Sequence, residues 1–117
     1  MKVLSSIEIR AVVEELQQFV DGKIDQVYQP DSTELVFSIH KTGEGRKLLR
    51  IVPGVALYVA RKKRKVPVQP PNFCRFLRKR IKGARITKIK QKEFERIVEF
   101  HLDAKEEKFV MMCEFFS

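Results

Sequence analysis

Cysteine is scarce in this sequence, and long apolar runs are missing. Only two cysteines occur among 117 residues, Cys74 and Cys113, without CxxC spacing and without a nearby histidine. This argues against a disulfide framework and a structural zinc site, so we interpret both as buried thiols in a reducing cytoplasm. No apolar run approaches the roughly 20 residues of a membrane span, and the first residues lack the apolar core of a signal peptide. We expect a cytoplasmic chain with no membrane contact, metal ion or cofactor.

Glycine and proline are also few, at five residues each. Their low number excludes low-complexity and collagen-like chains. With 44% hydrophobic and 33% charged residues, a chain of this length suits one domain that buries its own core. No internal repeat or linker divides it, so we treat residues 1–117 as a single domain.

Acidic residues are absent from one segment, residues 61–92, which carries 14 basic residues. The formal net charge of the chain is +9, whereas segments 1–60 and 93–117 carry −1 and −4. A basic block between mildly acidic flanks is typical of a surface that binds a polyanion.

The apolar pattern before the basic block predicts one helix and three strands. Ser5 and Glu8 have the capping-box spacing, which predicts a helix that begins there and ends near Asp21. Apolar alternation and turn residues predict strands within residues 35–40, 48–52 and 55–60. Their meander order indicates an antiparallel sheet.

The basic block predicts a loop and a second helix. Residues 61–71 combine five adjacent cations with three prolines, which predicts an exposed loop. A helix opened by Pro71 or Asn72 and closed by Gly83 follows. Strands are predicted over residues 85–91, 94–103 and 108–116, so the fold class is α+β with a mainly antiparallel sheet.

The second helix is predicted to have two opposite faces. The apolar face comprises Phe73, Phe76, Leu77 and Ile81, and the basic face comprises Arg75, Arg78, Lys79 and Lys82. A solvated face usually mixes both signs, and no acid is within reach in the sequence, so polyanion binding is favoured over plain solvation. Because the two phenylalanines are assigned to the core and tryptophan is absent, we expect recognition of phosphates or folded RNA shape, not base stacking. Arg80 falls on the apolar side, where it either snorkels or meets a carboxylate of another element.

No catalytic constellation is visible. His40 and His101 lie on predicted strands without metal-ligand spacing, and the chain contains no P-loop, GxGxxG or GxSxG motif. We therefore expect no enzyme activity. Arg96 shares the core-facing parity of Val98 and Phe100, so it forms either a structural salt bridge or a functional group at a rim.

Four segments, taken together, resemble a known family in matching order. They are residues 4–9, 22–29, 71–86 and 94–98. The resemblance is to the NFACT N-terminal domain, found in the ribosome quality-control proteins called NEMF in animals and RqcH in bacteria, and historically described as fibronectin-binding protein A. It covers about residues 4–116 and is of an archaeal kind.

The resemblance implies a fold and a domain boundary. Family members are similar to the N-terminal domain of formamidopyrimidine-type DNA glycosylases, a β-sandwich with two flanking helices. Those glycosylases use an N-terminal proline and a following glutamate, whereas this chain begins Met1-Lys2-Val3, so base excision is not expected. The family domain runs beyond Ser117, and residues 110–116 are apolar on both faces. We therefore expect the domain to be incomplete at its C-terminus, with the later coiled-coil and RNA-binding regions absent.

The resemblance also implies partners and site residues. Members bind the large ribosomal subunit carrying a stalled peptidyl-tRNA and recruit tRNA. Their acidic residue in the first helix and their Asp-Arg pair match Glu8, Glu95 and Arg96, although both acids are Glu here. The remaining candidate RNA-binding residues are Arg61, Lys62, Lys63, Arg64, Lys65, Arg75, Arg78, Lys79, Lys82 and Arg85.

Two alternatives remain open from the sequence. Glu8 is explained equally well by the capping box. The chain as a whole is alternatively a protein-interaction domain whose basic surface binds acidic protein segments.

Overall fold

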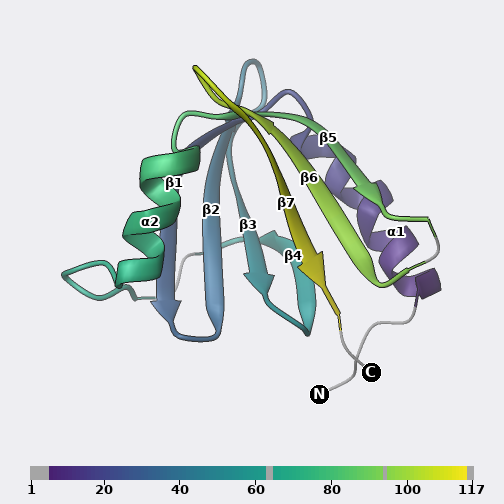
Figure 1. Ribbon diagram of the computed structural model, residues 1–117, viewed down its shortest axis with the longest axis horizontal. Helices are drawn as coiled ribbons and strands as arrows, with labels where there is room; N and C mark the ends of the chain where they lie inside the picture. Colours follow the sequence, from purple (N-terminus) through teal and green to yellow (C-terminus); the bar gives the residue numbers. More distant parts are fainter. Residues whose placement is uncertain (1–5, 63–64, 94, 116–117) are drawn as a thin grey trace.

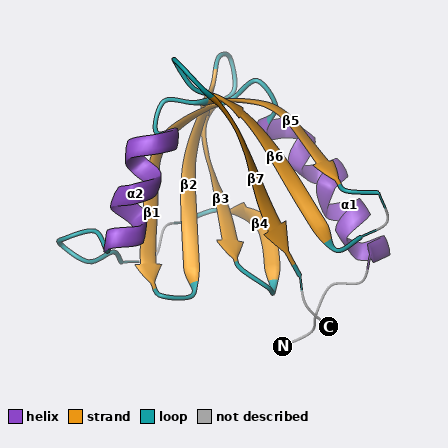
Figure 2. Ribbon diagram, viewed as in Figure 1, coloured by secondary structure: helices purple, strands orange, loops and turns teal. Residues whose placement is uncertain are grey.

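The computed structural model of the chain describes residues 6–62, 65–93 and 95–115. Seven strands and two α-helices, with one short 3-10 helix, make up these residues (Figures 1 and 2). In chain order they are α1 (Ser6–Leu16), the 3-10 helix (Gln17–Phe19), β1 (Lys23–Asp31), β2 (Glu34–Lys41), β3 (Gly45–Val52), β4 (Ala56–Ala60), α2 (Asn72–Ile81), β5 (Arg85–Gln91), β6 (Ile97–Asp103) and β7 (Lys108–Glu114).

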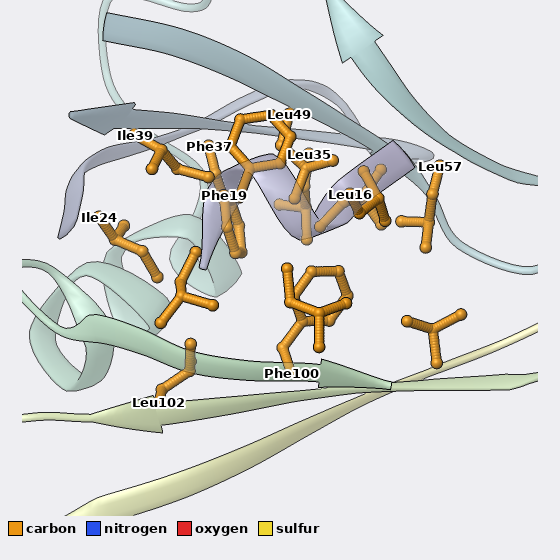
Figure 3. Packing of buried hydrophobic residues seen from close by; sticks show 14 of the residues in the cluster. Leu16, Phe19, Ile24, Leu35, Phe37, Ile39, Leu49, Leu57, Phe100 and Leu102 are labelled. Carbon is orange, nitrogen blue, oxygen red and sulfur yellow. The ribbon is translucent and has the colours of Figure 1, made fainter. Parts of the chain in front are cut away.

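All strands belong to one antiparallel sheet with the order β4-β3-β2-β1-β5-β6-β7. The sheet is narrowest in its middle, because β1 pairs with β5 only at Lys23 and Arg85. Beyond that pair the two halves diverge, and they face each other across the core (Figure 3). A parallel bridge between Gly54 and Phe115 links the two outer edges. The sandwich expected from the sequence is therefore one sheet folded over itself.

The core lies between the two halves of the sheet. Phe37 on β2 and Phe100 on β6 enter it from opposite sides, and Leu16 and Phe19 enter from the first helical segment (Figure 3). Each of these side chains is at most 1% exposed. The helical spacing predicted for the first helix is confirmed, although its last turn is a 3-10 helix.

Gly22 connects this first helix to the sheet at a point of close approach. A β-carbon there would lie 2.6 Å from Cγ2 of Ile39 and 2.9 Å from the carbonyl oxygen of Phe19. The Gly22 carbonyl also accepts a hydrogen bond from the backbone N–H of Ile86, on the other half of the sheet. Only glycine leaves room for this junction.

Strand β1 is the element that the sequence pattern failed to predict. Its buried residues, Ile24 and Val27, are three positions apart, because the pairing register with β2 shifts between Ile24 and Gln26. A bulge of this kind breaks the period of two by which a strand is recognised. The other six predicted strands are confirmed, with β6 beginning at Ile97 rather than at residue 94.

Both cysteines are free thiols. Cys74 is completely buried, and burial raises the pKa of the Cys113 thiol to about 12. The thiolate is the reactive form, so the raised pKa makes Cys113 unreactive at neutral pH, and Cys74 packs inside the core. Among the described residues, no helix is long and apolar enough to cross a membrane.

Candidate nucleic-acid interface

The helix α2 lies against β1 at one end of the molecule, and α1 lies at the other end against β5 and β4 (Figure 1). Because β1 pairs with β5 only at Lys23, the carbonyl of Val27 faces α2. It accepts a hydrogen bond from Nε of Arg78 at 2.8 Å and a weaker one from Sγ of Cys74 at 3.3 Å. These contacts determine which side of α2 faces the sheet.

The buried side of α2 agrees only in part with the predicted one, because Ile81 is buried and Leu77 packs against the core, whereas both phenylalanines lie outside it. It is centred on Cys74 and Ile81, which are 0% and 4% exposed, whereas Phe73 and Phe76 are 52% and 51% exposed. At 100° per residue, these phenylalanines lie about a quarter turn or more away from the buried side. The prediction that both are core residues, and with it the argument against base stacking, is wrong.

Arg78 has a structural role, unlike the rest of the basic stripe. In addition to its bond with Val27, its guanidinium lies over the ring of Tyr28, 5.7 Å from the centroid. Lys79 and Lys82 are exposed, and among the described residues neither forms an ion pair. Arg75 is exposed too, and its Nη2 donates to Oδ1 of Asn72 at 2.6 Å. Arg75, Lys79 and Lys82 therefore present three charges without a balancing acid on α2.

Arg80 is exposed, and no carboxylate of the described residues forms an ion pair with it. Its guanidinium stands over the ring of Phe76, with Cζ 4.8 Å from the centroid. Such a cation–π contact keeps the charge in solvent while the side chain covers the ring. This is the snorkelling alternative, with an exposed ring as the apolar surface.

Two shallow hollows at the C-terminal end of α2 bring in cations that the sequence did not single out. One is lined by Lys79, Arg80, Lys82 and Lys105, and the other by Lys23, Lys82, Arg85 and Lys105. Lys23 and Lys105 line the second hollow because Lys23 of β1 pairs with Arg85 of β5, and Arg85 pairs with Asp103 of β6. These pairs bring the ends of the three strands together. No sequence signal marks the two lysines, since both lie outside the basic block.

The same end of the molecule also carries acids. Glu106 and Glu107 line the first hollow, Asp103 lines the second, and Oδ1 of Asp21 lies 3.7 Å from Nη1 of Arg85. Arg85 is thus partly neutralised. The helix α2 itself contains no acidic residue, but Lys79 and Lys82 share the two hollows with these acids.

The predicted loop leads from the end of β4 to the start of α2, on the α2 side of the molecule (Figure 1). Arg61, Lys62 and Lys65 are exposed in it. Lys63 and Arg64, which belong to the same run of cations, lie outside the described residues. The described loop cations thus extend the basic surface of α2 towards its N-terminal end.

The Glu95-Arg96 pair lies in the turn between β5 and β6. Glu95 is exposed and Arg96 is half-buried. The turn is held in place because Nε2 of Gln91 donates to the Glu95 carbonyl and the Phe115 N–H donates to the Arg96 carbonyl, both at 2.8 Å. Within the described part of the chain, no carboxylate forms an ion pair with Arg96. The described residues therefore do not support the alternative that Arg96 forms a structural salt bridge.

The structure therefore divides the predicted site into two parts. Glu8 lies half-buried in the first turn of α1, and this turn and the β5–β6 turn lie towards the same end of the molecule, whereas α2 and the basic loop lie at the other (Figure 1). The longest dimension of the backbone is 35 Å. Residues 75–82 and Arg96 thus lie towards opposite ends of the molecule, with the exposed Lys88, Lys90 and Lys92 along and just after β5 between them.

The histidines add no catalytic arrangement. His40 is exposed, and Nε2 of His101 lies 3.2 Å from Oε1 of Glu99, which also lies 3.7 Å from Nζ of Lys90. In the described ranges, no group of three histidine, cysteine or carboxylate side chains has metal-binding geometry. Glu99 is a buried carboxylate that lies beside Lys90 and His101 on its own sheet.

Comparison with known proteins gives one consistent result. Residues 5–117 match the family described as NFACT N-terminal and middle domains. The chain is 31% identical to the archaeal Rqc2 homolog aRqcH of Methanocaldococcus jannaschii, over 97% of this chain and 18% of that protein. It is 32% identical to the Rqc2 homolog RqcH of Bacillus subtilis, over 78% of this chain and 16% of that protein. The chain thus spans less than a fifth of the length of these relatives.

Solved structures agree with the sequence matches. The N-terminal domain of the fibronectin-binding protein PavA from Streptococcus pneumoniae superposes with a TM-score of 0.87 at 29% identity, over 95% of this chain and 45% of that one. The N-terminal part of the fibronectin/fibrinogen-binding protein from Streptococcus suis superposes with a TM-score of 0.89 at 23% identity, which shows a shared fold.

Proposed function

Since the chain belongs to the NFACT N-terminal and middle-domain family, we propose that it is a non-enzymatic RNA-binding domain of a cytoplasmic, ribosome-associated quality-control factor. Its partners are tRNA and the large ribosomal subunit. The observation that carries this proposal is the exposed basic side of α2, where Arg75, Lys79 and Lys82 form no ion pair with any described residue and the helix itself has no acid. Residues 1–117 correspond to 45% of the solved PavA N-terminal domain, and the proposal includes a fold akin to that of the formamidopyrimidine-type glycosylases.

The proposal assigns the two parts of the site to different stretches of RNA. The α2 side, extended by Arg61, Lys62 and Lys65, binds phosphates without reading sequence. The Glu95-Arg96 turn contacts tRNA separately, because it lies at the other end of a molecule 35 Å long. A half-buried arginine beside an exposed carboxylate is suited to a defined contact with a phosphate or base edge.

Titration of the chain with fluorescently labelled tRNA at several salt concentrations tests this function. If Z cations neutralise phosphates, the slope of log affinity against log salt is roughly −0.7Z to −0.9Z. The three unpaired cations of α2 alone therefore give a slope of about −2 to −3. Undetectable binding at low salt, or an affinity that does not change with salt, would contradict the proposal.

The variant Arg96→Ala tests the second part of the site. We expect weaker tRNA binding by about 5- to 10-fold, as for loss of one charge-assisted contact of about 1 to 1.5 kcal/mol, with an unchanged circular dichroism spectrum and thermal midpoint. Lys92→Ala, in the same turn, is the control and is expected to have a smaller effect, because Lys92 is fully solvated. A variant that unfolds would instead assign Arg96 to the structure.

The alternative function is binding of acidic protein segments through the same basic surface. Two observations favour it. The hollow at the end of α2 is lined by side chains of both signs, and the structurally similar PavA is a fibronectin-binding protein. Competition separates the two functions. If an acidic peptide displaces tRNA at an equal concentration of negative charge, contacts specific to RNA contribute nothing to the affinity. That result would favour the protein-binding function.

A further inference from the structure

Two aromatic rings stand exposed on a helix that is otherwise basic. Phe73 and Phe76 each expose about half of their surface, and their rings are parallel to within 12°, with centroids 6.5 Å apart. They lie side by side on one flank of α2, and each ring leaves apolar surface in water, which favours neither the folded state nor solubility. The RNA-phosphate function described above uses neither ring.

The rings have cations on one flank and an apolar hollow on the other. Arg80 stands over Phe76, and Lys79 lies about 60° from Phe76 around the helix axis, whereas Arg75 lies about 160° from Phe73, on nearly the opposite side of the helix. On its other flank Phe76 lines a hollow with apolar residues of α2, β6 and β7, and Arg80 lies at the rim of that hollow too. No residue of α2 is acidic. An apolar partner protein would have to bury these charges beside its own apolar surface, at a large desolvation cost. A nucleic-acid strand presents both what the rings bind and what the cations bind.

We propose that the exposed side of α2 is a stacking platform for unpaired nucleobases of single-stranded RNA. A base stacks on the ring of Phe73, and phosphates of the same strand lie against Lys79 and Arg80. Because the guanidinium of Arg80 already covers Phe76, that ring supports Phe73 and extends the apolar surface. Aromatic platforms flanked by cations bind single strands with little sequence preference, since every base has a π-face.

This inference rests on the proposed RNA-binding function and narrows it. It states that the stretch of RNA against α2 is unpaired, because the bases of an A-form duplex are stacked on one another and are not available to a protein ring. A phosphate-only surface would bind duplex and single strand alike once charge density is allowed for.

Fluorescence anisotropy with two labelled probes tests the platform, using a short oligouridylate and an RNA duplex of the same length. Phe73→Leu keeps an apolar, helix-compatible side chain and removes the ring, so we expect about 5-fold weaker binding of oligouridylate and less than about 2-fold change for the duplex. Tyr58→Leu is the matched control, because Tyr58 is 38% exposed but lies on β4. It is expected to change neither affinity.

Each remaining outcome overturns a specific claim. If Phe73→Leu changes neither affinity, or both equally, the platform is refuted while RNA binding by the α2 cations stands. The exposed rings would then be a surface for an apolar partner. If the wild-type chain binds neither probe at low salt, RNA binding itself is refuted, and the platform falls with it.

Discussion

Replacing Arg75, Lys79 and Lys82 together by glutamine is expected to weaken tRNA binding on the order of 100-fold at about 0.1 M salt. Each lost phosphate contact removes about 0.7 to 0.9 from the slope of log affinity against log salt. Three contacts therefore make the slope shallower by about 2 to 3, and about 0.1 M lies one decade below the salt concentration at which counterion release contributes nothing. The measurement is the tRNA titration repeated at several salt concentrations.

The fold is expected to tolerate this triple change. All three side chains are exposed, and among the described residues none of them forms an ion pair. Like charges at this helical spacing repel, so their removal stabilises α2 slightly. An unchanged urea midpoint therefore accompanies the loss of affinity.

A second triple variant controls for net charge. Lys41, Arg46 and Lys47 already face carboxylates, with Nη2 of Arg46 at 2.8 Å from Asp25 and the two lysines at 3.1 and 3.7 Å from Glu44. Changing these three to glutamine removes the same formal charge. It should weaken tRNA binding less than about 10-fold, because cations already paired with carboxylates contribute little to the electrostatic attraction of tRNA. Equal losses in both variants would mean that the net charge of +9 attracts tRNA and that α2 is not the interface.

The limits of α2 could be predicted from the sequence, but its rotation could not. Pro71 and Gly83 are local signals, and they mark the ends of the helix correctly. Which side faces the sheet depends on the Val27 carbonyl, more than 40 residues earlier in the chain, which bonds Cys74 and Arg78. Hydrophobicity alone selects a face that includes Phe73 and Phe76 together with Leu77 and Ile81. The structure keeps Leu77 and Ile81 against the core but rotates the helix towards Cys74, which leaves both phenylalanines exposed.

The positions of the candidate site residues in space could not be predicted from the sequence either. The basic block is continuous in sequence, but the diverging halves of the sheet separate α2 from the turn that holds Arg96 (Figure 1). The same geometry brings Lys23 and Lys105 to the end of α2 from segments with no net basic character. The separation of α2 from Arg96 and the approach of Lys23 and Lys105 to α2 both follow from the short pairing between β1 and β5. The sequence does not predict this pairing, because the register shift in β1 obscures the strand pattern.

The variant Phe100→Ala should lower the free energy of unfolding by about 3 to 5 kcal/mol. Phe100 is 0% exposed and pairs with Ile89 and Met111 on the neighbouring strands, so its ring fills the space where the two halves of the sheet face each other (Figure 3). A loss of this size is a large share of the about 5 to 15 kcal/mol that typically stabilises a domain. In urea, monitored by circular dichroism, the midpoint should fall by about 2 M.

Phe73→Ala is the matched control for this change in side-chain volume. The same atoms are removed from a ring that is half exposed, so the cost should be about 1 kcal/mol or less. If Phe100→Ala costs as little as Phe73→Ala, the two halves of the sheet close over the vacated space. The short junction between β1 and β5, formed by the Lys23–Arg85 pair and the backbone hydrogen bonds beside it, would then act as a hinge between them. If instead the two costs differ as expected, the halves are held at a fixed separation by their packing, and the distance between α2 and the Arg96 turn is a rigid property of the domain.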